Sequence, residues 1–235
     1  MQSSTTDPLA TLEKEIRIKF KNRTLLETAL IHKSYINEHR SEGRKHNERM
    51  EFLGDAVLEL VTTDFLFATF PASGEGELTT FRSALVKGKH LSEVARTLGL
   101  GEYLLLSHGE EKSGGREKNY ILANTLEALI GAIYLDRGFE VAHKFIDRFI
   151  LTNLGDILQK GLHVDAKSRF QELSQERLST TPNYRVMSEE GPDHNKTFEI
   201  GAFVGEEEVA RGKGSSKQKA EEAAATSALA VKKWL

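Results

Sequence analysis

The sequence predicts a mainly α protein, in which an all-helical domain is followed by a small α-β-β-β-α domain. Two observations predict this fold class. From residue 9 to about residue 157, apolar residues recur at spacings of three and four, which is the helical period. From about residue 165 the pattern changes to a short helical stretch, then to alternating stretches typical of strands, and finally to an alanine-rich helical stretch.

The change of pattern also divides the chain. We expect a helical domain, a linker and a second domain at residues 1–157, 158–164 and 165–235. A cluster of Gly and Asn at 153–161, near the end of the first domain, supports this boundary. In the second domain we expect a helix, two strand segments and a final helix at 166–178, 184–186, 198–202 and 216–233.

Composition and charge exclude several classes of protein. The 235 residues include no cysteine, which excludes disulfides, zinc–thiolate sites and thiol nucleophiles. No secretory signal is visible, and the longest weakly charged run, 120–135, is too short to span a membrane, so we expect a cytoplasmic protein. Residues 1–162 carry 21 basic against 23 acidic side chains and 163–235 carry 11 against 12. Any contact with nucleic acid must therefore come from a local basic patch.

Residues 46–60 predict a helix with one acidic face. At 100° per residue, an arc of about 80° carries the acidic side chains, which are Glu48, Glu51, Asp55 and Glu59. The side chains roughly opposite are Met50, Leu53, Val57 and Leu60. An ordinary solvated face is one interpretation, but like charges at these spacings repel each other and no cation on that face relieves them.

Glu127 is the more informative carboxylate, because it is the only charge in 120–135, which otherwise predicts a buried helix. A buried carboxylate needs a cation, a set of donors or a metal, or it becomes protonated. Asn124 lies one turn earlier on the same face. With Glu51 and Asp55 from the other helix, these residues could form an all-oxygen cage suited to Mg²⁺ or Mn²⁺ rather than to zinc. A structural pairing of Glu127 with an arginine remains an alternative.

Four segments resemble motifs of the bacterial ribonuclease III family, in the family's order. They are ALIHKSY (29–35), HNERMEFLGDAVLEL (46–60), GEGELTTFRSALV (74–86) and KSGGREKNYILANTLEALIGAIYLD (112–136). The second domain resembles a double-stranded-RNA-binding domain, so the resemblance covers nearly the whole chain. It implies a homodimeric endoribonuclease that uses Mg²⁺, with Mn²⁺ as a substitute, and no nucleotide cofactor. The enzyme would cut both strands of duplex RNA, leaving 5′-phosphates, 3′-hydroxyls and short 3′ overhangs, and would process precursor ribosomal RNA and other structured RNAs.

The resemblance also implies roles for individual residues. The metal ligands would be Glu51, Asp55, Asn124 and Glu127, of which Asp55 and Glu127 would be catalytic. Glu48 and Glu75 would lie around the metal and contact its water molecules or RNA. The helical pattern alone assigns Phe52 to the core, whereas the family uses this position in its subunit interface.

Asn124 departs from the family's pattern, in which this position is usually an aspartate. The amide oxygen can still bind a metal, but the site loses one negative charge and should hold the metal less tightly. An alternative is therefore a duplex-RNA-binding protein on the same fold that has lost turnover. A third possibility, an all-helical nucleotide pyrophosphohydrolase with an acidic Mg²⁺ site, fits poorly with the second domain.

The segment 210–225 predicts a phosphate-binding patch. It contains four basic residues within nine positions and no acidic residue among them: Arg211, Lys213, Lys217 and Lys219. Cations in the first turn of a helix oppose its dipole, which makes little sense for stability but suits a grip on phosphate. A solvated basic turn is the alternative. The resemblance also implies minor-groove contacts from Gln171 and Gln175 on the first helix and from His194 in the strand-connecting loop. This chain has Gln218 at a position where the family usually has a second lysine.

A nucleophilic Ser–His pair is not expected in the first domain. His32 and Ser34 are two residues apart, and residues at this spacing do not face each other on a helix. We therefore expect His32 to be a core residue or to lie at a helix N-terminus rather than to activate a nucleophile.

Overall fold

The computed structural model of the chain describes residues 7–155, 166–192 and 196–234. The chain divides into two compact units, residues 1–163 and 164–235. The linker predicted at 158–164 lies outside the described residues. Within the described part of the chain, no helix combines the length and the apolar composition that crossing a bilayer requires.

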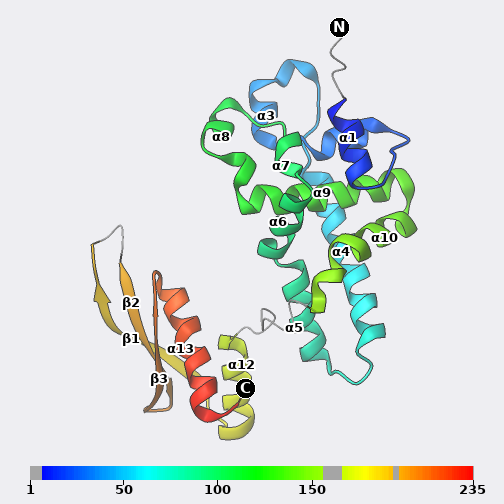
Figure 1. The fold of residues 1–235 in the computed structure, drawn as a ribbon. Helices are drawn as coiled ribbons and strands as arrows, with labels where there is room; N and C mark the ends of the chain where they lie inside the picture. Colours follow the sequence, from blue (N-terminus) through cyan, green and yellow to red (C-terminus); the bar gives the residue numbers. More distant parts are fainter. Residues whose placement is uncertain (1–6, 156–165, 193–195, 235) are drawn as a thin grey trace. The chain divides into compact units, whose positions relative to one another are not determined.

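The regular elements in the described residues of the first unit are helices, as predicted, apart from one isolated parallel bridge between Ile31 and Leu105 (Figure 1). Its α-helices are α1 (Pro8–Glu15), α2 (Arg23–Ala29), α3 (Lys33–Glu38), α4 (Glu48–Thr69), α5 (Glu75–Val86), α6 (Gly88–Thr97), α7 (Leu100–Tyr103), α8 (His108–Lys112), α9 (Asn119–Arg137) and α10 (Phe139–Phe149). Its 3-10 turns are η1 (Arg40–Glu42), η2 (Gly115–Glu117) and η3 (Leu151–Asn153).

Helix α9 is the centre of this unit. In Figure 1 it lies in the middle of the helical unit, and α2, α4, α6 and α10 all pack against it. A helix surrounded in this way must be apolar on most of its circumference. The buried residues of α9 meet that requirement and include Ile121, Leu122, Leu126, Leu129, Ile130 and Ile133. Glu127 is therefore a charge placed within the most buried helix of the unit.

Helices α4 and α9 cross with their backbones in direct contact. A Cβ atom on Gly54 of α4 would collide with the carbonyl oxygen of Glu127, and one on Gly131 of α9 would collide with the carbonyl oxygen of Met50. Only glycine allows so close an approach of two helix backbones. These two glycines fix the relative position of the helices, and hence of the side chains beside the crossing.

The crossing also corrects two predictions about α4. The helix predicted at 46–60 is confirmed and continues to Thr69. Because the face around Gly54 turns toward α9, the side chains buried with it include Val57, Leu58 and Val61. Leu60, predicted on the apolar face, is 59% exposed, and Phe52 is 81% exposed, so its assignment to the core is wrong.

The second unit has the predicted α-β-β-β-α order. Its elements are α12 (Ala166–Leu178), β1 (Pro182–Glu190), β2 (Thr197–Val204), β3 (Glu207–Gly214) and α13 (Lys217–Lys232). The strands form an antiparallel sheet in the order β1-β2-β3, and both helices pack against it (Figure 1). Phe170 and Leu173 from α12, Ala202 from β2 and Ala224 and Leu229 from α13 form its small core.

Candidate functional site

Four of the predicted metal-site residues lie on the two crossing helices. Glu51 and Asp55 lie one turn apart on α4, and Asn124 and Glu127 lie almost one turn apart on α9. Gly54 lies next to Asp55 and touches the backbone of Glu127, so the crossing brings the two pairs together. Glu51, Asn124 and Glu127 are half-buried, while Asp55 is exposed.

Two carboxyl groups of this set, those of Glu51 and Glu127, have raised pKa values. Burial raises the pKa of Glu127 to about 7, and the charges of Asp55 and Glu51 add to the effect. Burial, with the charge of Glu48, also raises the pKa of Glu51, while a hydrogen bond from the Asn124 amide acts in the opposite direction. Every charge that shifts the pKa of Glu127 is negative. Among the described residues, Glu127 forms no ion pair with an arginine. The alternative that Glu127 has a structural arginine partner is therefore wrong.

These carboxylates do not form a ready-made cage. Within the described residues, no group of three or more His, Asp or Glu side chains is placed so that it could hold a metal ion. Glu51 and Asp55 are thus close enough to raise the pKa of Glu127, although the three carboxylates do not converge on one point. The contact at Gly54 fixes their backbone positions, and rotation about side-chain bonds is what remains to bring their oxygens together.

Glu48 lies at the start of α4 and has a cationic partner. Lys33 Nζ lies 2.9 Å from Glu48 Oε1, and His46 Nδ1 lies 3.6 Å from Glu48 Oε2. The hydrogen bond from Lys33 lowers the pKa of Glu48. Sequence reasoning missed Lys33, because its segment lies apart from the acidic helix and only the fold brings the two together. The position of Lys33 within the motif ALIHKSY was the available signal.

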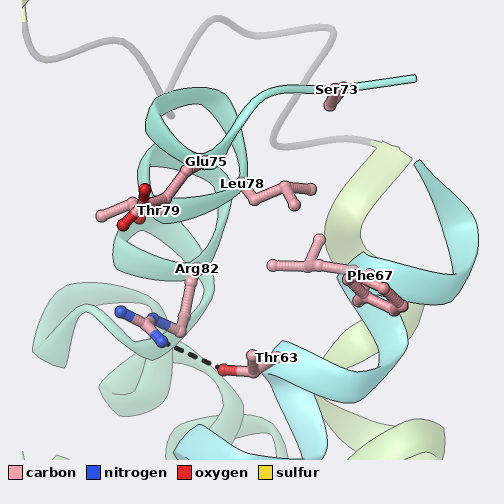
Figure 2. Close-up of a pocket in the computed structure, with 8 residues that line it drawn as sticks. Thr63, Phe67, Ser73, Glu75, Leu78, Thr79 and Arg82 are labelled. Carbon is pink, nitrogen blue, oxygen red and sulfur yellow. Dashed lines mark hydrogen bonds between the residues drawn. The ribbon is translucent and has the colours of Figure 1, made fainter. Parts of the chain in front are cut away.

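Glu75 lies in the first turn of α5 and lines a pocket of about 440 Å³ between α4 and α5. Figure 2 shows Glu75 and Arg82 on α5 together with Thr63 and Phe67 on α4. Arg82 donates a hydrogen bond to Thr63 Oγ1 at 3.1 Å. Glu75 is not among the charges named as causes of the raised pKa values of Glu51 and Glu127. Within one chain, Glu75 is therefore a residue of this pocket.

His32 and Ser34 do contact each other, contrary to expectation. His32 Nδ1 lies 2.8 Å from Ser34 Oγ, because His32 is the N-cap of α3 and has an extended backbone rather than a helical one. Ser34 Oγ also accepts a hydrogen bond from the Ser107 backbone N–H at 3.0 Å. The Ser34 hydroxyl thus links the start of α3 to the start of α8, and the placement of His32 at a helix N-terminus is confirmed.

The predicted phosphate-binding residues lie where β3 meets α13. They are Arg211 and Lys213 on β3, and Lys217 and Lys219 in the first turn of α13. Ser216 caps the helix by accepting a hydrogen bond from the Lys219 backbone N–H at 3.3 Å. A Cβ atom on Gly214 would lie 2.5 Å from the backbone nitrogen of Ala220, so the end of the strand directly abuts the start of the helix. This approach places the end of β3, with Arg211 and Lys213, beside the start of α13, with Lys217 and Lys219, and we call these four cations the basic corner.

Three of these cations have carboxylate partners that sequence reasoning missed. The pairs are Arg211 with Glu208 at 2.5 Å, Lys213 with Glu199 at 3.8 Å and Lys217 with Glu189 at 3.4 Å. Glu189 and Glu199 lie on other elements than their lysine partners, so these two pairs depend on the register of the sheet. Alternation along the strands was the only signal, and it was too weak to fix that register.

The minor-groove contacts stay predictions, and two of the three residues lie in the described part of the second unit. Gln171 and Gln175 are both exposed on α12, one turn apart. Gln175 Nε2 donates a hydrogen bond to Thr181 Oγ1 at 3.1 Å. His194 lies outside the described residues.

The two units together define a class of protein. Carboxylates gathered on two crossing helices, in one chain with an α-β-β-β-α unit that carries a basic corner, are the features of a two-domain RNA endonuclease. A family model described as "Ribonuclease-III-like" matches residues 22–154, and one described as "Double-stranded RNA binding motif" matches residues 166–232. The chain belongs to the ribonuclease III family and is an endoribonuclease with a C-terminal double-stranded-RNA-binding domain.

Relatives and solved structures agree with this assignment. The chain is 44% identical to Ribonuclease 3 of Carboxydothermus hydrogenoformans over 225 residues, which cover 96% of each protein. It is 46% identical to Ribonuclease 3 of Desulfotalea psychrophila over 224 residues, covering 95% of this chain and 92% of the relative. The nuclease domain of ribonuclease III from Campylobacter jejuni matches 62% of this chain and 97% of its own with a TM-score of 0.58 and 44% identity. The resemblance and the fold class are confirmed, and the pyrophosphohydrolase alternative is wrong.

Proposed function

We propose that this chain is a Mg²⁺-dependent endoribonuclease that acts as a homodimer on duplex RNA. It cuts both strands and leaves 5′-phosphates, 3′-hydroxyls and short 3′ overhangs, and Mn²⁺ can replace Mg²⁺. Its substrates are precursor ribosomal RNA and other structured RNAs of the cytoplasm. The observation that carries the proposal is Glu127, a half-buried carboxyl group in an apolar helix whose pKa is raised to about 7 by burial and by two neighbouring carboxylates.

The chemistry of the donor set fits a divalent cation. Glu51, Asp55 and Glu127 offer carboxylate oxygens and Asn124 offers an amide oxygen, which are the ligand types that Mg²⁺ prefers. Mutual repulsion of buried carboxylates is costly unless a cation offsets it. An ion held there supplies an acidified water nucleophile and stabilises the charge that develops on the phosphate and on the leaving oxygen.

The residues around the site orient its ligands. The Asn124 amide donates a hydrogen bond to Glu51, which leaves its oxygen free to face a metal. Lys33 holds Glu48 at the start of α4, beside the ligand set, where Glu48 can contact RNA or a water molecule. Glu75 reaches a substrate from the neighbouring pocket rather than from the α4–α9 crossing.

Cutting both strands requires two such sites, and an exposed apolar stripe on α4 supports a dimer. Phe52, Leu60 and Phe67 are 81%, 59% and 74% exposed and lie on the same helix. Large exposed apolar side chains that line up on one helix mark an interaction surface. Structural flexibility has been described in a region of the Campylobacter jejuni nuclease domain that is involved in dimer formation.

The RNA-binding unit supplies affinity for the duplex. Lys213, Lys217, Lys219 and Arg211 contact phosphates, while Gln171, Gln175 and His194 reach 2′-hydroxyls in the minor grooves. Recognition of this kind reads the A-form shape rather than the base sequence.

One observation favours a second candidate, a duplex-RNA-binding protein without turnover. Asn124 provides a neutral ligand where the family usually has an aspartate, so the site binds metal less tightly. The two candidates separate in one experiment: incubation of duplex and single-stranded RNA with the protein over a range of Mg²⁺ concentrations, followed by mapping of the product ends. We expect paired cuts in the duplex only, with 5′-phosphates. Duplex binding without cleavage at saturating Mg²⁺ would establish the second candidate.

A further inference from the structure

Two lysines of the basic corner form ion pairs with glutamates of the sheet. Lys217 Nζ lies 3.4 Å from Glu189 Oε1, and Lys213 Nζ lies 3.8 Å from Glu199 Oε1. Both lysine side chains are more exposed than their partners, at 59% and 63% against 36% and 24%. A phosphate that reaches either ammonium group therefore meets a cation that already has a carboxylate within 4 Å, at 3.4 Å for Lys217 and 3.8 Å for Lys213.

The sheet register produces these pairs. Glu199 on β2 lies directly opposite Lys213 on β3, and opposite Ser188 on β1. The next row runs from Glu189 through Phe198 to Gly214, the residue that abuts the start of α13. Both carboxylates thus lie at the end of the sheet from which α13 begins.

Further contacts hold the two glutamates in place. Lys217 Nζ lies over the Phe198 ring, 5.7 Å from its centroid, which limits where the ammonium group can go. Lys196 Nζ lies 3.5 Å from Glu189 Oε2, so Glu189 lies between two lysines. Ser188 Oγ donates a hydrogen bond to Glu199 at 3.4 Å. Neither carboxylate is a freely rotating surface group.

We infer that Glu189 and Glu199 act as intramolecular competitors of the RNA phosphates and set the affinity of the RNA-binding unit for duplex RNA. The inference rests on the proposed function, because it takes Lys213 and Lys217 as phosphate contacts. Each lysine must exchange its carboxylate for a phosphate, and the carboxylate then repels that phosphate at short range. Exposed ion pairs of this type contribute little to folding. Their cost therefore falls mainly on RNA binding.

The test compares charge-neutralising variants of the full chain. We expect Glu189→Gln and Glu199→Gln each to bind duplex RNA about three- to tenfold more tightly, with a smaller gain at higher salt because the effect is electrostatic. Binding is measured by fluorescence anisotropy in EDTA, so that no RNA is cut, on a duplex longer than the roughly 16 base pairs that one such domain spans.

Glu206→Gln is the matched control. Glu206 pairs with Arg185 at 3.4 Å, which is also a surface pair, but it lies at the turn between β2 and β3, at the opposite end of these strands from Gly214. The substitution changes the net charge equally and should leave the affinity within about twofold, since a surface change of this kind has little effect elsewhere. An equal gain in Glu206→Gln would show that net charge alone is responsible and would overturn the inference.

A double-mutant cycle with Lys217→Ala completes the test. If Glu189 competes for Lys217, the gain from Glu189→Gln should largely disappear when Lys217 is absent. A gain that persists in that background overturns the pairing mechanism. If Lys217→Ala itself leaves affinity unchanged, the proposed phosphate contact fails. If Lys217→Ala weakens binding but neither glutamine variant tightens it, the contact stands and the inference alone fails.

Discussion

Charged side chains have opposite surroundings at the α4–α9 crossing and at the basic corner. At the crossing, Glu127 feels only negative neighbours and its pKa rises to about 7. At the basic corner, Lys213 and Lys217 each have a carboxylate within 4 Å, at 3.8 and 3.4 Å respectively. No positive charge contributes to the pKa of Glu127, and a cationic ligand could supply one. At the basic corner the positive charges of Lys213 and Lys217 are already offset, so that an anionic ligand must compete for them.

This difference explains how a chain with a net charge of −3 can bind a polyanion. On the proposed function, a cation offsets the charge of the acidic region when RNA binds, while the basic corner attracts RNA locally. We therefore expect binding and catalysis to be separable, because each would depend on a different charge balance in a different unit. The predictions below perturb one region at a time.

The largest effect should come from Glu127→Gln. It keeps the shape of the side chain but removes the charge that a metal would balance, so we expect single-turnover cleavage to fall by at least about 100-fold, more than the loss of an outer-sphere partner of a metal. Duplex affinity in EDTA should stay within a few fold, because the basic corner is unchanged. Near wild-type cleavage at saturating Mg²⁺ would show that Glu127 is not a ligand.

The second prediction removes the basic corner. A fragment ending at Gly161 keeps every proposed ligand but loses Lys213, Lys217 and Lys219, and each lost phosphate contact should flatten the salt dependence of binding by about one unit of slope. The fragment should cut duplex RNA at low salt and fail near physiological salt. Cleavage is measured against salt concentration, with the full chain as the control.

The mass of the same fragment tests the dimer. Because the exposed stripe with Phe52 belongs to α4, sedimentation should show a dimer without the second unit. A monomer that still makes paired cuts contradicts the dimer proposal, and unchanged salt tolerance contradicts the proposal that the basic corner supplies most of the affinity.

The third prediction sharpens the acidic region. Asn124→Asp replaces a neutral ligand with a charged one. The Mg²⁺ concentration for half-maximal rate should therefore fall by roughly three- to tenfold, since even loss of a partner outside the ligand shell changes metal affinity by about 10- to 100-fold. Asn124→Ala is the matched control and should raise that concentration. A value for Asn124→Asp equal to or above that of the wild type would show that the amide is not a ligand.

The sequence predicted what depends on local pattern. Periodicity located α4, α9 and the α-β-β-β-α order, and the lone charge of Glu127 marked the site, because both signals lie within one segment. The sequence could not show that Phe52 is exposed, because the pattern of apolar residues in one helix does not determine which of them pack against a neighbouring helix. The face of α4 that is buried is set by the contact of Gly54 with α9, which is a property of two segments.

The same limit applies to ion pairs. Lys33 with Glu48, and Lys213 with Glu199, join residues from different segments, and their pairing depends on helix packing in one case and on strand register in the other. A one-residue slip would place Lys213 on the other face of the sheet. The three lysines and the arginine of the basic corner were thus predictable as a group, while the carboxylates that oppose them were not.

The smallest expected effect concerns stability rather than rate, and it tests the charge imbalance directly. The pKa of Glu127 is raised from 4.5 to about 7 in the folded chain, so folding favours the protonated form. That contribution to stability is fully present below pH 4.5 and is lost as the pH rises through about 7. Without metal, Glu127→Gln should therefore melt above the wild type at pH 8, by about 2–4 °C for each kcal/mol involved, and the difference should shrink toward pH 4.5. Added Mg²⁺ should raise the melting temperature of the wild type more than that of the variant, because the ion binds the charged form. If Glu127→Gln melts lower than the wild type at pH 8 in EDTA, the carboxylate is already balanced within the protein, and the contrast between the two regions is wrong.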